Sequence, residues 1–259
     1  YSVDISNDYI IIGDFSNGFG APIPFIGAAY IYQKDINEVW QFKQKLISFD
    51  GQSNDNFGYS VSISGKKCVV GAQQHMGNQG AAYIFEENSS GFWVLVNKLM
   101  DPSNTPSDYF AQLVSMTSDV IVIGAANDDH DVLGNNYLHN SGAVFIFEKN
   151  SSGIWQETQK IVAPDRFING GFGSSIFIDF DRIIIGAGSL NRSIDNLYLQ
   201  TSGAYIYEKN PMGVWEFVQK LNPPDPADHL GFGNAVGLSD DYAIVSAIDE
   251  RVDELGNTL

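Results

Sequence analysis

The chain has 259 residues and a formal net charge of −17, from 31 acidic residues against 14 lysines and arginines. Such an excess of negative charge repels phosphate groups, which argues against nucleic acids and anionic membrane surfaces as partners. The single cysteine, Cys68, excludes an internal disulfide, and no segment approaches the ~20 consecutive apolar residues of a membrane-spanning helix, so we expect no insertion into a membrane.

Two blocks alternate along the sequence. The chain opens inside a copy of the first block, which ends at Gly13. Further copies of this block run from Phe-Gly to Gly-Ala over fourteen residues, with small variations, and begin at Phe57, Phe110, Phe172 and Phe232. The second block runs from Gly-Ala through aromatic and aliphatic residues to a Trp and then Lys-Leu or Lys-Ile, and its copies begin at Gly27, Gly80, Gly142 and Gly203. Self-similarity of this kind predicts a repeat architecture.

Each pair of blocks predicts four strands. Residues 59–64 alternate apolar and small polar side chains, which is typical of a strand with two unlike faces. A short turn follows, and then an apolar run such as 121–123 or 183–185, which is typical of a strand buried on both faces. The Gly-Ala block supplies the third strand.

The fourth strand runs from the Trp to the Lys-Leu pair, as in residues 40–46. Its alternation predicts that Trp40, Phe42 and Leu46 share one face, with glutamine and lysine side chains on the other. Mixed polarity suits an outer edge strand that must not pair with other chains. Helix is nearly absent from the pattern.

Four antiparallel strands per repeat of about 53 to 62 residues predict an all-β fold made of β-propeller blades. We expect one domain over 1–259, with repeats at approximately 1–58, 59–111, 112–173 and 174–233 and a partial repeat at 234–259. The first block supplies the first two strands of a blade and occurs five times, and the second block supplies the last two strands and occurs four times. Together they give 18 strands, or about four and a half blades. Because both ends supply the same half, we expect a larger ring, completed by further blades of the same polypeptide or by a neighbouring copy.

The loop between the second and third strands varies most among the repeats. From one Gly-Ala position to the next the spacing is 14, 9, 18 and 17 residues along the chain. Loops that vary on a constant scaffold are where recognition tends to lie. We therefore expect any binding surface on the face that carries these loops.

The two blocks together resemble the FG-GAP repeat of integrin α-subunit β-propellers, and most of all the calcium-poor variety found in bacterial and protist surface proteins. The resemblance covers the whole chain and implies a propeller, typically of seven blades, in an extracellular adhesion or surface protein. We do not expect the calcium-binding loop of this family in the present chain. Short turns such as 64–67 and 239–242 stand where it would lie, and they lack the six or more oxygens that Ca²⁺ takes.

Two acidic loops are the remaining candidates for Ca²⁺, and we expect no other cofactor. In one loop Asn127, Asp129 and Asp131 stand at alternate positions, and a second loop in register with it contains Asp249 and Asp253. The alternative interpretation is a solvated acidic turn on an acidic protein.

Three Asn-x-Ser/Thr sequons, at Asn88, Asn150 and Asn191, are candidates for glycosylation. The first two stand in the same hairpin of successive repeats, where Asn-Ser-Ser-Gly also makes a good turn without sugar. The four histidines, His75, His130, His139 and His229, are interpreted as incidental surface residues. The repeated Trp is interpreted as an aromatic that packs one blade on the next, against the alternative of a row that stacks on sugars.

These observations predict a non-enzymatic extracellular or cell-surface propeller, an adhesion or assembly module that contacts other protein subunits or surface glycans. A lectin-like carbohydrate-binding propeller is the alternative, and a propeller glycoside hydrolase is a distant one. No nucleophile motif or phosphate-binding loop stands out from the repeats, so no catalytic residue is assigned.

Overall fold

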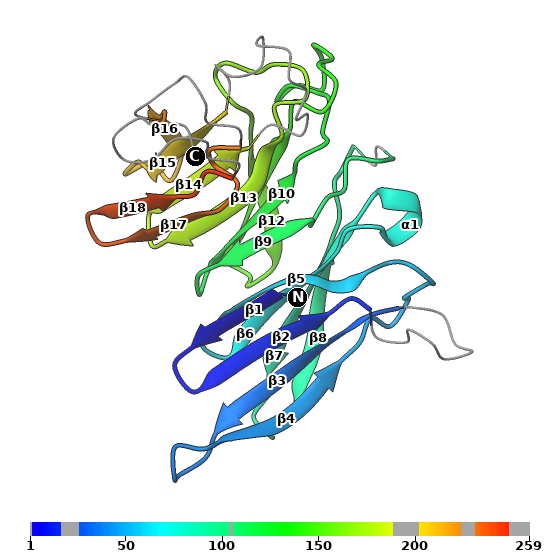
Figure 1. Cartoon of the computed structure of the whole chain (residues 1–259). Coiled ribbons are helices and arrows are strands. Elements are labelled where there is room, and N and C mark those ends of the chain that lie inside the picture. The colour runs from blue at the N-terminus through cyan, green and yellow to red at the C-terminus, as the bar shows by residue number, and fades with distance from the viewer. Residues whose placement is uncertain (1, 17–25, 104–105, 189–201, 224–230, 249–259) are drawn as a thin grey trace. The chain divides into compact units, whose positions relative to one another are not determined.

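The computed structural model describes residues 2–16, 26–103, 106–188, 202–223 and 231–248. Over these residues the fold is all-β: the chain forms strands β1 to β18 and one short helix, α1 (His75–Asn78). The strands form four four-stranded sheets and one hairpin, which are β-propeller blades (Figure 1). The predicted fold class, including 18 strands in about four and a half blades, is confirmed.

The blades follow one another along the chain. Blade 1 contains β1 (Ser2–Ser6), β2 (Tyr9–Asp14), β3 (Ala28–Lys34) and β4 (Trp40–Leu46). Blade 2 contains β5 (Phe57–Ser64), β6 (Lys67–Ala72), β7 (Ala81–Glu87) and β8 (Trp93–Leu99). Blade 3 contains β9 (Leu113–Met116), β10 (Val120–Ala125), β11 (Ala143–Lys149) and β12 (Trp155–Ile161). Blade 4 contains β13 (Phe172–Asp179), β14 (Arg182–Ala187), β15 (Gly203–Lys209) and β16 (Trp215–Leu221), and the hairpin is β17 (Val236–Ser239) with β18 (Tyr242–Val245).

The chain divides into two compact units. The first unit contains residues 1–123 and 146–158, and the second contains residues 124–145 and 159–259. Blades 1 and 2 therefore belong to the first unit, blade 4 and the hairpin belong to the second, and blade 3 contributes to both.

One expectation about the fourth strand is wrong. A β-bulge between Ile31 and Tyr32 shifts the pairing of β3 with β4, so that Tyr32 pairs with Phe42 while Ala29 pairs with Leu46. Paired residues lie on the same side of a sheet, and the extra residue reverses the alternation. Phe42 therefore lies with the tyrosine rings, 58% exposed, whereas Leu46 faces the core. The same bulge recurs in blades 2 and 4.

The Phe-Gly and Gly-Ala motifs interlock where neighbouring blades meet. Gly27 forms a parallel bridge with Phe57, and Gly142 forms the same bridge with Phe172. The backbone of Gly27 has a φ of +87°, and a Cβ at this position would lie 2.9 Å from the carbonyl carbon of Phe57 and closer still to its oxygen. Glycine is therefore required here both for its conformation and for the close approach of two backbones.

The alternating polar residues of the first strand bind the next blade. Three hydrogen bonds run from backbone N–H groups of β5 and of the turn that follows it to side-chain oxygens of β1. They join Val61 N to Ser2 Oγ (3.1 Å), Ile63 N to Asp4 Oδ2 (2.8 Å) and Gly65 N to Ser6 Oγ (3.0 Å). Serine and aspartate recur in these strands because their short side chains satisfy the N–H groups of the neighbouring inner strand.

In blades 2 and 4 the phenylalanine of the Phe-Gly motif packs on the aromatic residue of its own third strand. Phe57 meets Tyr83 edge-on with ring centroids 5.3 Å apart, and Phe172 meets Tyr205 in the same way at the same distance. All four rings are fully buried. Edge-to-face packing of this kind stabilises a core beyond the area that it buries.

Candidate functional site

A buried tyrosine, a lysine and an aspartate form a clip in blade 2. The Lys98 ammonium lies over the Tyr83 ring, 5.5 Å from its centroid. Both groups donate to Asp50, in the linker that precedes the blade: Tyr83 Oη to Oδ1 at 2.8 Å and Lys98 Nζ to Oδ2 at 2.6 Å. The clip ties the linker to the third and fourth strands.

His75 extends this clip into a larger network. Its Nδ1 lies 2.7 Å from Asp55 Oδ2, and its Nε2 lies 2.7 Å from Lys98 Nζ. The carboxylate can only accept and the ammonium can only donate, so this arrangement fits a ring with its proton on Nδ1. His75 is 2% exposed and Asp55 3% exposed. The interpretation of His75 as a surface histidine is therefore wrong, because its ring joins the linker to α1 inside the blade.

The same clip recurs in the second unit. Tyr205 Oη donates to Asp165 Oδ1 and Lys220 Nζ donates to Oδ2, both at 2.6 Å. The Lys220 ammonium lies 5.1 Å from the centroid of the Tyr205 ring. In blades 2 and 4 the recurring spacing of Tyr and Lys is thus explained, since both groups donate to the aspartate of the preceding linker.

The clips shift the pKa values of their members. Burial alone would raise the pKa of Asp50, but the hydrogen bonds from Lys98 and Tyr83 and the charge of Lys98 outweigh it and hold that pKa below its ordinary value. Asp165 behaves in the same way with Lys220 and Tyr205. Burial, and then the hydrogen bond to the carboxylate, raise the pKa of Tyr83.

This shift predicts a specific pH dependence. A carboxylate whose pKa is lower in the folded chain than its ordinary ~3.9 stabilises the fold above that value, and this stabilisation is lost as the pH falls through the lower, folded value. The double variant Asp50→Asn with Asp165→Asn is therefore expected to lose less stability than the wild type between about pH 5 and pH 2.5. Urea midpoints measured at stepped pH check this. Identical pH profiles of the two proteins would contradict it.

Both ring nitrogens of His75 in the blade 2 network already have partners within the protein. His75 and Asp55 resemble a catalytic base with the carboxylate that orients it, but the Nε2 of His75 lies against the Lys98 ammonium. Both side chains are buried, which leaves them no face for a substrate. The arrangement therefore acts as a structural tie.

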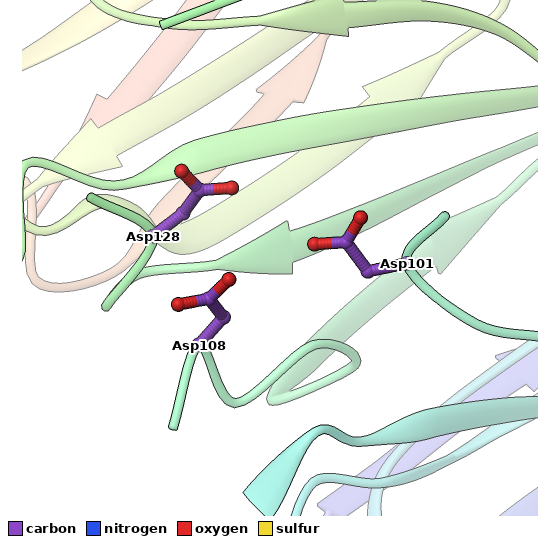
Figure 2. Close-up of side chains that lie close together, drawn as sticks. All are labelled: Asp101, Asp108 and Asp128. Carbon is purple, nitrogen blue, oxygen red and sulfur yellow. The ribbon is translucent and has the colours of Figure 1, made fainter. Parts of the chain in front are cut away.

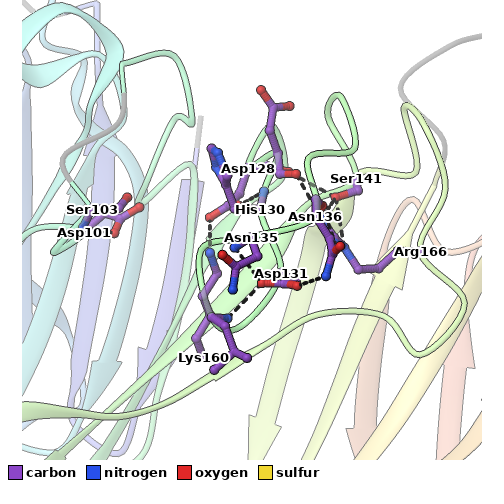
Figure 3. Close-up of polar contacts among 12 residues, drawn as sticks. Asp101, Ser103, Asp128, His130, Asp131, Asn135, Asn136, Ser141, Lys160 and Arg166 are labelled. Carbon is purple, nitrogen blue, oxygen red and sulfur yellow. Dashed lines mark hydrogen bonds and ion pairs between the residues drawn. The ribbon is translucent and has the colours of Figure 1, made fainter.

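The acidic loop that follows β10 is built from its own hydrogen bonds (Figure 3). Asp131 Oδ1 accepts from the backbone N–H groups of Leu133 and Asn135, and its Oδ2 accepts from the Asn136 side chain. Asp129 Oδ1 accepts from the backbone N–H of Asn140. Both metal candidates thus shape the loop. Binding of Ca²⁺ by Asp129 and Asp131, with the partly buried Asn127, stays a prediction, and Asp249 and Asp253 lie outside the described residues.

Arg166 holds the same loop from the following linker. Its guanidinium donates to the backbone oxygens of Asn136 and Asp129, at 3.1 and 3.0 Å, and to Ser141 Oγ at 2.9 Å. Asp128, at the base of the loop, is 1% exposed and accepts from Lys160 Nζ at 2.7 Å. The loop is therefore fixed at both ends, within the second unit.

The sequence patterns did not single out two buried aspartates of the first unit. Asp101 comes two residues after the end of β8, and Asp108 comes two residues before Phe110 (Figure 2). They are 6% and 2% exposed, and one carboxylate oxygen of each lies within 4.8 Å of the other. Asp128, the third side chain in Figure 2, belongs to the second unit, where it pairs with Lys160.

The repeated Trp is buried in blades 2 to 4, whereas Trp40 of blade 1 is partly exposed. Trp93, Trp155 and Trp215 are 2 to 5% exposed. Trp93 meets Tyr9 of blade 1 edge-on at 5.5 Å, and the Gln44 side chain of blade 1 pairs with both backbone groups of Trp93. These contacts confirm packing between blades at Trp93, and the burial of the three rings leaves no face for a sugar.

Two of the sequon asparagines stand at the first position of a hairpin turn. Asn88 Oδ1 accepts from the N–H groups of Ser90 and Phe92, each at 3.0 Å. The same pattern of residues i+2 and i+4 recurs at Asp35, Asn150 and Asn210. Asp35 and Asn210 belong to no sequon, so turn formation explains the residue type by itself. Glycosylation stays a prediction, and Asn191 lies outside the described residues.

Two substitutions at Asn88 separate the turn from the sequon. Asn88→Ala is expected to cost about 1 kcal/mol, because two N–H groups lose their acceptor. Asn88→Asp keeps the acceptor, as Asp35 does in blade 1, and is expected to be nearly neutral. Chemical denaturation of unglycosylated protein measures both. Equal destabilisation by the two variants would contradict a turn role for the oxygen.

No helix among the described residues has the length and apolar character needed to span a membrane. The family model described as FG-GAP repeat matches residues 40–85, 93–147 and 215–257, together more than half of the chain. Each matched segment begins at one of the repeated tryptophans, Trp40, Trp93 and Trp215. None of the curated proteins matches the sequence.

Proposed function

The chain belongs to the FG-GAP repeat family, and from this premise we propose that it is a non-enzymatic extracellular or cell-surface module for adhesion or assembly. FG-GAP repeats are compatible with a propeller that binds other proteins. The partners in this proposal are protein subunits or glycoproteins at a cell surface. The acidic chain, with its net charge of −17, favours a partner surface of positive charge.

The observation that carries the proposal is the loop 127–141. Internal hydrogen bonds of Asp131 and three contacts from Arg166 fix its shape. It nevertheless presents Leu133 and Tyr137 to solvent, 79% and 63% exposed. An ordered loop with an exposed leucine and tyrosine suits binding, because little conformational entropy is lost and apolar area is available.

A binding assay on intact cells tests the proposal. The full chain, biotinylated and held on fluorescent streptavidin, is applied to cells of its own species. Binding is expected to fall at least tenfold in the double variant Leu133→Ser with Tyr137→Ser. The control is Phe180→Ser, which removes a ring that is 83% exposed in the β13–β14 turn of the same unit. Failure of the wild-type chain to bind, or equal loss in the control, would contradict the proposal.

Treatment of the cells distinguishes the kinds of partner. Protease treatment is expected to abolish binding and glycosidase treatment to leave it, because we assign the contacts to protein. The opposite result would favour the lectin alternative, which a glycan array would then test directly. No observation on the described residues favours a glycoside hydrolase.

A further inference from the structure

The linker between β8 and β9 holds two carboxylates in a buried position. Asp101 and Asp108 are 6% and 2% exposed, and one oxygen of each lies within 4.8 Å of the other. Like charges this close raise the free energy of the fold unless something neutralises them, and burial strengthens the repulsion.

Asp101 has one carboxylate oxygen that lacks a hydrogen-bond partner among the described residues. Its Oδ1 accepts from the backbone N–H of Ser103 at 2.8 Å. Its Oδ2 is buried and accepts no hydrogen bond from the described residues, and among those residues Asp101 forms no ion pair. A carboxylate oxygen that is withdrawn from water without a partner is costly, which points to a ligand at this position.

The preceding linker shows what the chain does elsewhere. Asp55 stands two residues before Phe57, as Asp108 stands two residues before Phe110. Asp55 is matched by His75, and Asp50 in the same linker is matched by Lys98. Asp55 and Asp50 thus each receive a side-chain donor, whereas the donor to Asp101 among the described residues is the backbone N–H of Ser103.

We propose that Asp101 and Asp108 bind a divalent cation of the hard, oxygen-preferring class, with Ca²⁺ as the first choice. Two oxygens that are each about 2.3–2.6 Å from one Ca²⁺ are at most about 5.2 Å apart, so a separation within 4.8 Å fits a shared ion. Two carboxylates also balance its charge. This site lies before the Phe-Gly position, outside the interval that holds the family's calcium loops, and it is independent of the proposed adhesion.

Thermal unfolding of the full chain tests the site. Ca²⁺ in hundredfold excess over its Kd, added after EDTA treatment and dialysis, is expected to raise Tm by about 5 °C. Asp101→Asn and Asp108→Asn are each expected to abolish that shift. Asp131→Asn is the matched control, since it removes an acidic group whose oxygens are already occupied within its loop, and it is expected to keep the shift.

Three results would overturn the proposal. They are the absence of a shift in the wild type, its persistence in both linker variants, and its loss in Asp131→Asn, which would place the ion in the acidic loop instead. If a linker variant does not fold, calorimetric titration with Ca²⁺ decides. Equal stoichiometry for the wild type and Asp131→Asn supports the linker site, and no binding to the wild type refutes it.

Discussion

Replacement of Gly80 by alanine is expected to lower the free energy of unfolding by about 3 kcal/mol or more. Gly80 has a φ of +85°, and an added Cβ would lie 2.7 Å from the carbonyl carbon of Phe110 and closer to its oxygen. Both atoms belong to backbone that is held by the next Phe-Gly-type motif, so the clash cannot be relieved by a side-chain rotation. The backbone at Gly80 must therefore move away from the backbone at Phe110, which loosens the contact between blade 2 and the start of the following repeat.

Gly213→Ala isolates this clash from backbone strain. Gly213 also has a φ of +85°, but the nearest atom to an added Cβ is Lys209 Cε, in ordinary contact at 3.8 Å. Gly213→Ala is therefore expected to lower the free energy of unfolding only by the conformational cost of a positive φ, about 1 kcal/mol. Urea unfolding of both variants gives the comparison. Equal losses at the two positions would show that close approach of the backbones does not explain the glycine.

The strands of this fold could be predicted because the sequence repeats. Residues 59–64, 121–123 and 183–185 all lie within strands as expected, since the period of the side chains and the turn residues recur in register. The face of the fourth strand could not be predicted in this way. A bulge at Lys43 adds one residue to β4 without any mark in the sequence, and it places Phe42 and Leu46 on opposite faces of the sheet.

The polar contacts were harder to predict than the strands. His75 and Lys98 stand 23 residues apart and Asp50 stands 48 residues before Lys98, so their contacts depend on the blade being folded. One signal was available: the Lys of the Lys-Leu pair recurs in every repeat, although an exposed edge needs no particular lysine. The buried carboxylate of Asp101 had no such signal, because its position does not repeat in register.

Replacement of His75 by leucine is expected to cost about 3 kcal/mol. Leucine is apolar and fits a site that is 2% exposed, so the loss is assigned to Asp55. That carboxylate is 3% exposed and would keep only the backbone N–H of Gln52, at 2.8 Å, among its described donors. Removal of one partner from a buried polar pair leaves the other desolvated without compensation.

A double-mutant cycle separates this effect from packing. Asp55→Asn alone leaves an amide beside the imidazole. The single His75→Leu variant leaves the buried Asp55 charge without its partner, and the combination of His75→Leu with Asp55→Asn removes that charge. The double variant is therefore expected to be about 1–2 kcal/mol more stable than the sum of the single losses predicts. His139→Leu is the control, because the His139 side chain is 57% exposed, and its effect should stay within about 0.5 kcal/mol. Simple additivity of His75 and Asp55 in urea unfolding would mean that the ring acts only by filling space. In that case the network would be an incidental contact rather than the tie between the linker and blade 2.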